Sequence, residues 1–340
     1  MNGQLRELTS RLLADRKMFQ LVFIALFVVT LFSVTSRDVF FTAYNFTSMA
    51  YQVPEVAILS IAVMLSMLTG GIDLSIVAIS NASALVASYI MIKNLNEAGT
   101  TPNSWILVAC LIGILVGVMC GLVNSLLIAW LNITPILATL ATMTLFNGIA
   151  IGITNGKATS GLPEQFLRLG NGTFFGIPTP FITMAIIAIF IGFLINRTGL
   201  GLKIFLIGTN RKAAQYSGIA DRKVIAWTYA LSGCLSAIAG LIIASRTSAA
   251  SPDFGTSYIL LAIVIVVLGG VNPAGGFGTV SGVVLATVVL QMLSSGFNAL
   301  RFNQFYYLVA QGGMLIAVMV LNLVIERRSI NGAIQQSRRN

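Results

Sequence analysis

The sequence predicts an all-α polytopic transmembrane helical bundle with about ten spans and with broken helices in two repeat-related halves. Of the 340 residues, 56% are hydrophobic and only 9% are charged, whereas a soluble chain is about one-quarter charged. Apolar stretches near 20 residues, the length that crosses a hydrocarbon core of about 30 Å, recur along the whole chain. These runs do not alternate apolar and polar residues as the strands of a membrane barrel do, so they favour helices.

The apolar stretches divide the chain into candidate spans separated by Gly, Pro, Asn or charged residues. The ten spans are 18–36, 47–69, 75–92, 104–131, 135–154, 179–196, 222–245, 257–270, 279–297 and 305–325. If the amino terminus lies in the cytoplasm, fourteen of the twenty Lys and Arg residues fall on the cytoplasmic side, as the positive-inside rule requires. An even number of spans places both termini there. We therefore expect one integral-membrane domain, 1–340, with short cytoplasmic tails at 1–17 and 326–340.

The composition argues against several classes of function. Histidine is absent and the three cysteines lie inside apolar runs, which disfavours metal sites, catalytic triads and a disulfide framework. The basic residues lie at span ends and form no patch on a soluble domain, so a nucleic-acid partner is not expected. No Gly-x-x-x-x-Gly-Lys-Ser/Thr loop occurs, so the chain holds no Walker-type ATP site of its own. A membrane-embedded enzyme is the weakest alternative, because no nucleophile–base pair is evident.

Two glycine pairs interrupt apolar runs in the two halves of the chain. Gly70-Gly71-Ile72-Asp73-Leu74-Ser75 breaks the first, and Gly269-Gly270-Val271-Asn272 breaks the second. Broken helices at corresponding places in two halves are typical of transporters, in which the exposed backbone lines a pathway. Two tight cytoplasmic turns would explain the same glycines. A substrate path or gate is therefore predicted at a set of residues that flank both breaks: Gly70, Gly71, Asp73, Ser75, Gly269, Gly270 and Asn272.

Polar groups within the spans have both structural and functional interpretations. A carboxylate near membrane depth is a functional hypothesis by default, yet Asp73 could instead cap the helix that begins near Ser75, and this structural role is favoured. Glu55 receives the same structural interpretation, near the start of its span. Interhelical hydrogen bonding is the preferred role of the other polar side chains, which are Asn81, Asn124, Thr139, Thr142, Asn147, Gln291 and Asn298. The Gly-x-x-x-Gly repeat at Gly113, Gly117 and Gly121 predicts close helix packing.

Two loops are long enough to have a role of their own. Residues 155–178, on the outer side, are rich in glycine and other turn formers, and residues 197–222, on the cytoplasmic side, contain a short helical stretch over 210–216. An ion-coupled carrier would need several ionisable groups in mid-membrane, and only Asp73 and Glu55 are available. Energy is therefore expected from a partner at the cytoplasmic loop.

At this loop the sequence resembles a known family, the ribose-type permeases of bacterial monosaccharide ABC importers, over about Phe46 to Ile325. Its signatures are Gly70-Gly71-Ile72-Asp73-Leu74-Ser75, the run 135–143, Leu231-Ser232-Gly233, Val267-Leu268-Gly269-Gly270 with Gly275-Gly276-x-Gly278, and Gly208-x-Asn210-x-x-Ala213-Ala214-x-x-Ser217-Gly218-Ile219. The resemblance implies that the last segment docks on an ATPase subunit, through Asn210, Ala213, Ala214, Ser217, Gly218 and Ile219. Departures occur at Ile76 to Ala78 and at Tyr258 to Leu260, and the latter is similar to the subgroup that imports rhamnose or autoinducer-2.

The resemblance implies a permease subunit in the bacterial inner membrane that imports a monosaccharide or sugar-like molecule. Its partners would be a second permease chain, identical or homologous, two ATPase domains that carry ATP and Mg, and an external sugar-binding protein that delivers its cargo over the 155–178 loop. The chain itself would bind no cofactor and catalyse no reaction. The alternative function is an ion-coupled secondary transporter of a small polar solute.

Overall fold

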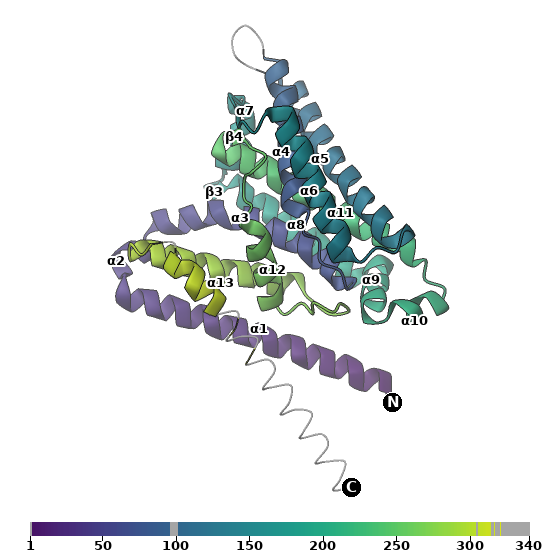
Figure 1. The fold of residues 1–340 in the computed structure, drawn as a ribbon. Helices are drawn as coiled ribbons and strands as arrows, with labels where there is room; N and C mark the ends of the chain where they lie inside the picture. Colours follow the sequence, from purple (N-terminus) through teal and green to yellow (C-terminus); the bar gives the residue numbers. More distant parts are fainter. Residues whose placement is uncertain (1, 96–100, 304, 314–315, 317–319, 321–340) are drawn as a thin grey trace.

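The structure is a computed structural model that describes residues 2–95, 101–303, 305–313, 316 and 320, with side chains described from residue 18 onward. Helices account for most of it (Figure 1). They are α1 Asn2–Thr35, α2 Arg37–Phe40, α3 Ala43–Leu68, α4 Ile76–Lys93, α5 Asn103–Ser125, the π-helix Leu126–Trp130, α6 Pro135–Thr154, α7 Glu164–Asn171, α8 Thr179–Arg197, α9 Gly199–Thr209, α10 Arg211–Tyr216, α11 Asp221–Thr247, α12 Tyr258–Leu268 and α13 Val280–Ala299.

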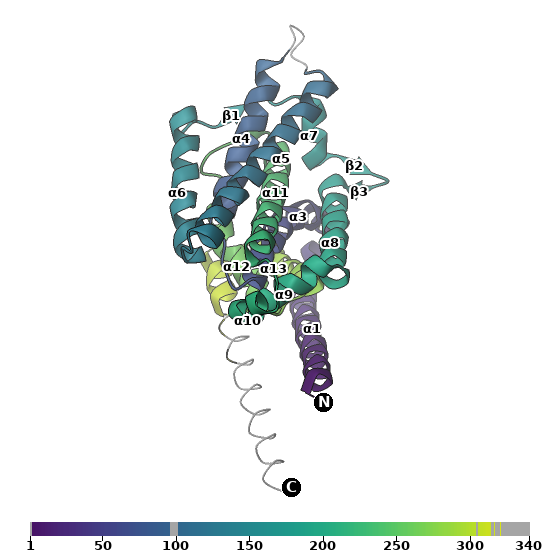
Figure 2. The same ribbon diagram turned by 90° about the vertical axis from the view of Figure 1, so that its right-hand side faces the viewer.

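Strands occur only as short pairs in the described part of the chain. β1 (Thr159–Ser160) pairs antiparallel with β4 (Ala249–Ala250), and β2 (Thr173–Phe174) pairs antiparallel with β3 (Ile177–Pro178). The first pair joins two loops that are far apart in sequence, and the second forms a hairpin that projects from the bundle beside α8 (Figure 2). The predicted all-α fold class is confirmed.

Within the described residues, eight helices are long and apolar enough to cross a membrane, and they match the first seven expected spans and the ninth. The expected span 257–270 corresponds to α12, which has 11 residues and is too short to cross a core of about 30 Å at 1.5 Å per residue. Of the expected span 305–325, residues 305–313 are helical, and most of the remainder lies outside the described residues, as does the tail 326–340.

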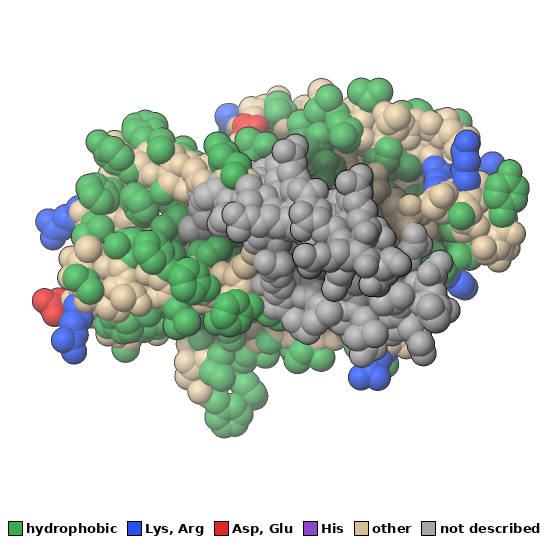
Figure 3. Space-filling model, turned by 90° about the horizontal axis from the view of Figure 1, so that it is seen from below, with side chains coloured by type: hydrophobic (Ala, Val, Ile, Leu, Met, Phe, Trp, Pro, Cys, Tyr) green, Lys and Arg blue, Asp and Glu red, His purple; other side chains and the backbone are tan. Residues whose placement is uncertain are grey.

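The helices form a bundle with two distinct ends. α7 and β4 lie at one end, the α7 end, and α9, α10 and the beginning of α1 lie toward the other, the α10 end (Figures 1 and 2). α3 and α11 are buried nearly all round, whereas α1, α5, α6 and α8 expose large hydrophobic side chains such as Phe23 and Phe190. Viewed from below, hydrophobic side chains cover much of the visible surface, and Lys and Arg lie at several places around its edge (Figure 3). This distribution fits helices whose outer faces contact lipid.

Glycines bring α5 into backbone contact with α11. A Cβ atom at Gly117 would overlap the carbonyl oxygen of Gly233, and one at Gly121 would overlap that of Tyr229. Gly113 faces α4, where a Cβ would lie 3.0 Å from the Ser83 carbonyl oxygen. The Gly-x-x-x-Gly repeat therefore serves helix packing, because only glycine permits this approach.

The two glycine breaks are built alike. After α3, the Gly70 amide donates to the Met67 carbonyl (2.9 Å) and the Gly71 amide to the Ser66 carbonyl (3.2 Å). After α12, the Gly270 amide donates to the Val267 carbonyl (3.0 Å) and the Val271 amide to the Val266 carbonyl (3.1 Å). These are Schellman caps whose left-handed residues are Gly70 and Gly270, with φ of +81° and +85°. Gly70 therefore corresponds to Gly270, so the two glycine pairs match one residue out of the register in which the sequence aligns them.

Candidate functional site

A buried polar network surrounds Asp73 in the segment between α3 and α4. Asp73 is fully buried. Its Oδ1 accepts hydrogen bonds from the Ser75 amide (3.0 Å) and the Ser75 hydroxyl (2.6 Å), and its Oδ2 accepts one from the Ser232 hydroxyl (3.2 Å). Because Ser232 lies near the middle of α11, the segment re-enters the bundle after Gly71 and does not form an exposed turn. The carboxylate thus fastens the start of α4 to α11.

The network continues into α5 and α6. The Asn124 amide donates to the Ser75 hydroxyl (2.7 Å) and its carbonyl accepts from the Thr142 hydroxyl (2.6 Å). Thr139 accepts from the Leu74 amide (3.2 Å) and donates to backbone carbonyls. Asn124 and the two threonines therefore make the interhelical bonds expected of them. Four elements, the Asp73 segment, α5, α6 and α11, meet in this one network.

Asp73 has polar partners but no ion pair in the part of the chain that the structure describes. Its geometry is that of a carboxylate that bonds the backbone at a helix start, three residues before the first residue of α4. The Tyr229 hydroxyl lies buried beside it without a hydrogen-bond partner among the described residues, and a Cβ at Gly71 would lie 2.7 Å from that hydroxyl.

The second break holds its predicted residues differently. Gly269 packs on α13, where a Cβ would lie 2.8 Å from the Val283 amide nitrogen, and Gly270 is buried. Asn272 is exposed, and its side chain accepts from the Ala274 amide (3.0 Å) within its own turn. The structure therefore does not bring Asn272 into the Asp73 network.

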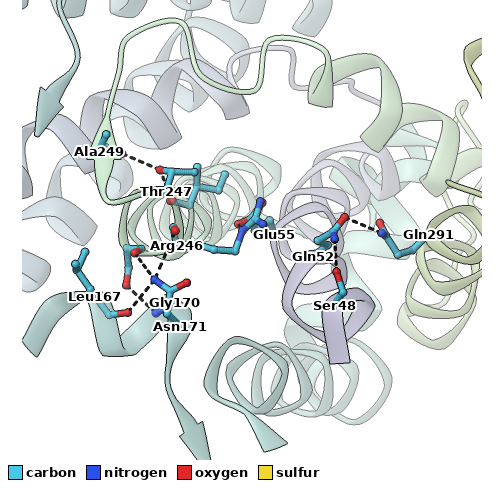
Figure 4. Close-up of polar contacts among 12 residues, drawn as sticks. Ser48, Gln52, Glu55, Leu167, Gly170, Asn171, Arg246, Thr247, Ala249 and Gln291 are labelled. Carbon is cyan, nitrogen blue, oxygen red and sulfur yellow. Dashed lines mark hydrogen bonds and ion pairs between the residues drawn. The ribbon is translucent and has the colours of Figure 1, made fainter. Parts of the chain in front are cut away.

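A second polar cluster lies between α3, α11 and α13 (Figure 4). Arg246 binds both carboxylate oxygens of Glu55, with 2.9 Å between Nη2 and Oε2. The Glu55 side chain is 1% exposed and that of Arg246 is 27% exposed. One turn earlier on α3, Gln52 accepts from the Gln291 amide (3.0 Å). The placement of Glu55 near the start of its span is wrong, because it lies midway along α3 and pairs with a basic residue.

The helix α7, which lies within the long loop 155–178, packs on the end of α11. The Gly170 amide donates to the Ser245 hydroxyl, which in turn donates to the Phe166 carbonyl, both at 2.7 Å. The Asn171 amide donates to the Ser245 carbonyl (2.9 Å), as Figure 4 shows in part. A cavity of about 500 Å³ opens beside α7 and is lined by Arg168, Leu169, Gly172, Thr173, Phe174, Thr179 and Ile182.

The predicted coupling segment forms α10 at the opposite end. Asn210 caps it, because its side chain accepts from the Ala213 amide (3.0 Å), and Gly218 ends it with a φ of +80°. Arg211 and Gln215 both donate to Asp221, the first residue of α11, at 2.8 Å. Ala213, Ser217 and Gly218 are exposed and Ile219 is half-buried. Ala214 is 4% exposed, so it packs inside the chain.

Sequence reasoning missed two of these arrangements. The Glu55–Arg246 pair joins residues 191 positions apart, and the only signal in the sequence was the presence of two charges within or beside apolar runs. Asp221 holds α10 against α11, and its signal was an acidic residue at the start of a span that follows a basic segment.

Comparisons with known proteins place this arrangement in a family. The family model described as a branched-chain amino acid transport system permease component matches residues 45–319. The chain is 36% identical to the ribose import permease protein RbsC of Bacillus subtilis over 88% of its length and 91% of the relative's, and 31% identical to the D-allose transport system permease protein AlsC of Escherichia coli over 90% and 91%.

A third relative is the autoinducer 2 import system permease protein LsrD of Salmonella typhimurium, which is 36% identical over 62% of this chain and 66% of its own. No solved structure gives a significant match. The matched residues 45–319 contain the Asp73 network, the Glu55–Arg246 pair and α10. The chain belongs to this family of transport-system permease components.

Proposed function

We propose that this chain is the membrane-spanning permease subunit of an ATP-binding-cassette importer for a monosaccharide or sugar-like molecule of the ribose, rhamnose or autoinducer-2 class. The observation that carries the proposal is the match of about nine-tenths of the chain to permeases named for ribose and D-allose. The subunit catalyses no reaction and binds no cofactor. ATP and Mg belong to two ATPase domains, which dock at the α10 end.

The exposed side of α10 supports this docking. Ala213 and Ser217 present small side chains to solvent, the Gly218 backbone is exposed, and Asp221 holds the helix against α11. A short helix that is fixed to a long one moves as a rigid body when a partner pushes on it. Ala214 faces inward and holds α10 in place instead of contacting the ATPase.

The membrane orientation follows from the charges. Both termini and the α10 end face the cytoplasm of the bacterial inner membrane, because fourteen of the twenty Lys and Arg residues fall on that side of the assigned spans. A binding protein delivers the sugar at the α7 end, and a second permease chain, identical or homologous, completes the path.

The ion-coupled alternative is weakened by the Glu55–Arg246 pair. Glu55 is already neutralised by a bidentate guanidinium, which leaves Asp73 as the one acidic side chain without a basic partner in the described spans. A proton- or ion-driven cycle needs more titratable groups than that at mid-membrane.

Reconstitution distinguishes the two functions. The chain is placed in liposomes with the ATPase and the binding protein encoded beside it, and uptake of labelled ribose, allose, rhamnose and autoinducer-2 is measured. We expect uptake only with the binding protein outside and ATP on the ATPase side. Sugar accumulation by the chain alone, in ATP-free vesicles under a proton or sodium gradient, would refute the importer assignment.

A further inference from the structure

Three backbone segments are in direct contact, with no side chain between them. They are the end of α9, the end of α3 and the turn before α13. A Cβ atom at Gly208 would overlap the Leu68 carbonyl oxygen and the Gly276 amide nitrogen. A Cβ at Gly275 would lie 2.7 Å from the Gly70 nitrogen and 2.8 Å from the Gly208 oxygen. We call these five residues, Leu68, Gly70, Gly208, Gly275 and Gly276, the glycine junction.

Within the junction, a hydrogen bond joins the first helix break to the turn that follows the second break. The Gly276 amide donates to the Leu68 carbonyl over 3.0 Å. Leu68 is the last residue of α3, and Gly276 lies in the turn that leads to α13. The break in the first half of the chain is therefore bonded to the turn in the second half.

Gly208 connects this junction to α10. It is the second-last residue of α9, and two residues later Asn210 caps α10. Backbone atoms in van der Waals contact cannot absorb a displacement by changing rotamers, as long side chains do. A shift of Gly208 therefore moves Leu68 and Gly276 with it.

We propose that Gly208 is a positioning residue that transmits movement of α10 to both helix breaks at once, through the glycine junction. This inference rests on the proposed function, since it takes the ATPase as the source of the movement. The competing route runs from α10 through Asp221 into α11. That route would displace α11 and, through the Asp73–Ser232 hydrogen bond, the first break, but it would leave the turn before α13 where it is.

Hydrogen exchange of the unmodified chain separates the routes. The permease is assembled with its ATPase in nanodiscs, and exchange is compared with and without ATP. Transmission through the junction changes exchange in 69–75 and in 272–279 together, at the same ATP concentration. A change in 221–230, with or without one in 69–75, that leaves 272–279 unaltered would overturn the proposal.

Matched glycine variants provide the second test. Gly208→Ala forces the junction apart, whereas Gly199→Ala lies on the same helix with no atom within 4 Å of the added Cβ. We expect Gly208→Ala to lower ATP-driven uptake about tenfold while ATP hydrolysis continues, and Gly199→Ala to match the unmodified chain. Uptake by a folded Gly208→Ala at the Gly199→Ala rate would overturn the proposal. If Gly208→Ala fails to fold, the hydrogen-exchange result on the unmodified chain decides.

Spin labels report the movement itself. Pro273→Cys and Lys157→Cys, both at exposed positions, are labelled on a background without Cys110, Cys120 and Cys234. ATP should shift the distance between the labels in the Gly199→Ala variant and not in Gly208→Ala. A shift that survives Gly208→Ala would contradict transmission through the junction. Failure of the unmodified chain to bind the ATPase or to take up sugar would refute the proposed function instead.

Discussion

Arg246 and Glu55 should not be equivalent when one of them is removed, because their side chains differ in exposure. Glu55 is 1% exposed and Arg246 is 27% exposed. Arg246→Gln leaves a carboxylate buried among helices without its cation, a situation that costs about 3–5 kcal/mol of stability. Glu55→Gln leaves an arginine side chain that is already partly exposed, so water can solvate it more easily than it can solvate Glu55. We therefore expect the larger loss from Arg246→Gln.

Unfolding in mixed detergent micelles, followed by the fluorescence of the three tryptophans, measures both losses. The double variant Glu55→Gln/Arg246→Gln should recover about 1 kcal/mol or more relative to the sum of the single variants, because two amides can bond each other. The matched control is Arg168→Gln, since the Arg168–Glu164 pair is 74% and 83% exposed. Its loss should stay within about 0.5 kcal/mol.

Two outcomes would refute this reasoning. One is an Arg246→Gln variant as stable as Arg168→Gln, which would mean that the buried Glu55–Arg246 pair contributes no more to stability than an exposed pair does. The other is a larger loss from Glu55→Gln than from Arg246→Gln, which would mean that the arginine is the less solvated partner.

Four further predictions concern the Asp73 network, the membrane orientation, α10 and the contact between α5 and α11. Asp73→Asn should transport at nearly the normal rate, because an amide still bonds Ser75 and Ser232. Asp73→Ala should lose about 1–3 kcal/mol of stability. Loss of uptake in a fully assembled Asp73→Asn variant would place the carboxylate on the substrate path. An impermeant thiol reagent should label Thr173→Cys and not Thr209→Cys in sealed cells, and the reverse would show that the assigned orientation is inverted. Ala213→Trp should leave folding intact and uncouple ATP hydrolysis from uptake. Ala214→Trp should reduce assembly, because of these two residues only Ala214 is buried. Uptake by Ala213→Trp at the normal rate would show that α10 does not couple the ATPase to transport. Gly233→Val should prevent α5 from packing on α11 and reduce folded yield, and Gly152→Val, with nothing within 4 Å of its added Cβ, should not; equal yields would contradict the backbone contact.

The sequence predicts most spans because length and apolarity are local properties. α12 is the exception: its apolar run ends at the Gly269-Gly270 cap, so the helix has 11 residues, although the surrounding composition resembles that of a full span. Hydropathy also does not predict the π-helix Leu126–Trp130, because a π-helix differs from an α-helix only in the hydrogen-bond pattern within the span.

The polar clusters were harder to predict because they depend on distant partners. Asn124, Thr139 and Thr142 stand out as polar groups in apolar spans, yet nothing local indicates that they meet Ser75 or the Asp73 segment. The register of the two glycine breaks is hard to predict for a different reason. Matching Gly-Gly to Gly-Gly ignores which glycine has a positive φ, and the caps show that Gly70 corresponds to Gly270.

The backbone contact between α5 and α11 depends on glycines that are required by helix packing and not by the transported molecule. Gly117, Gly121 and Gly233 are dictated by the distance between two helix axes, and any permease that keeps that distance needs glycine there, whatever it carries. These three positions therefore hold no information about the imported molecule. A change of cargo has to be sought at positions whose side chains have room to vary.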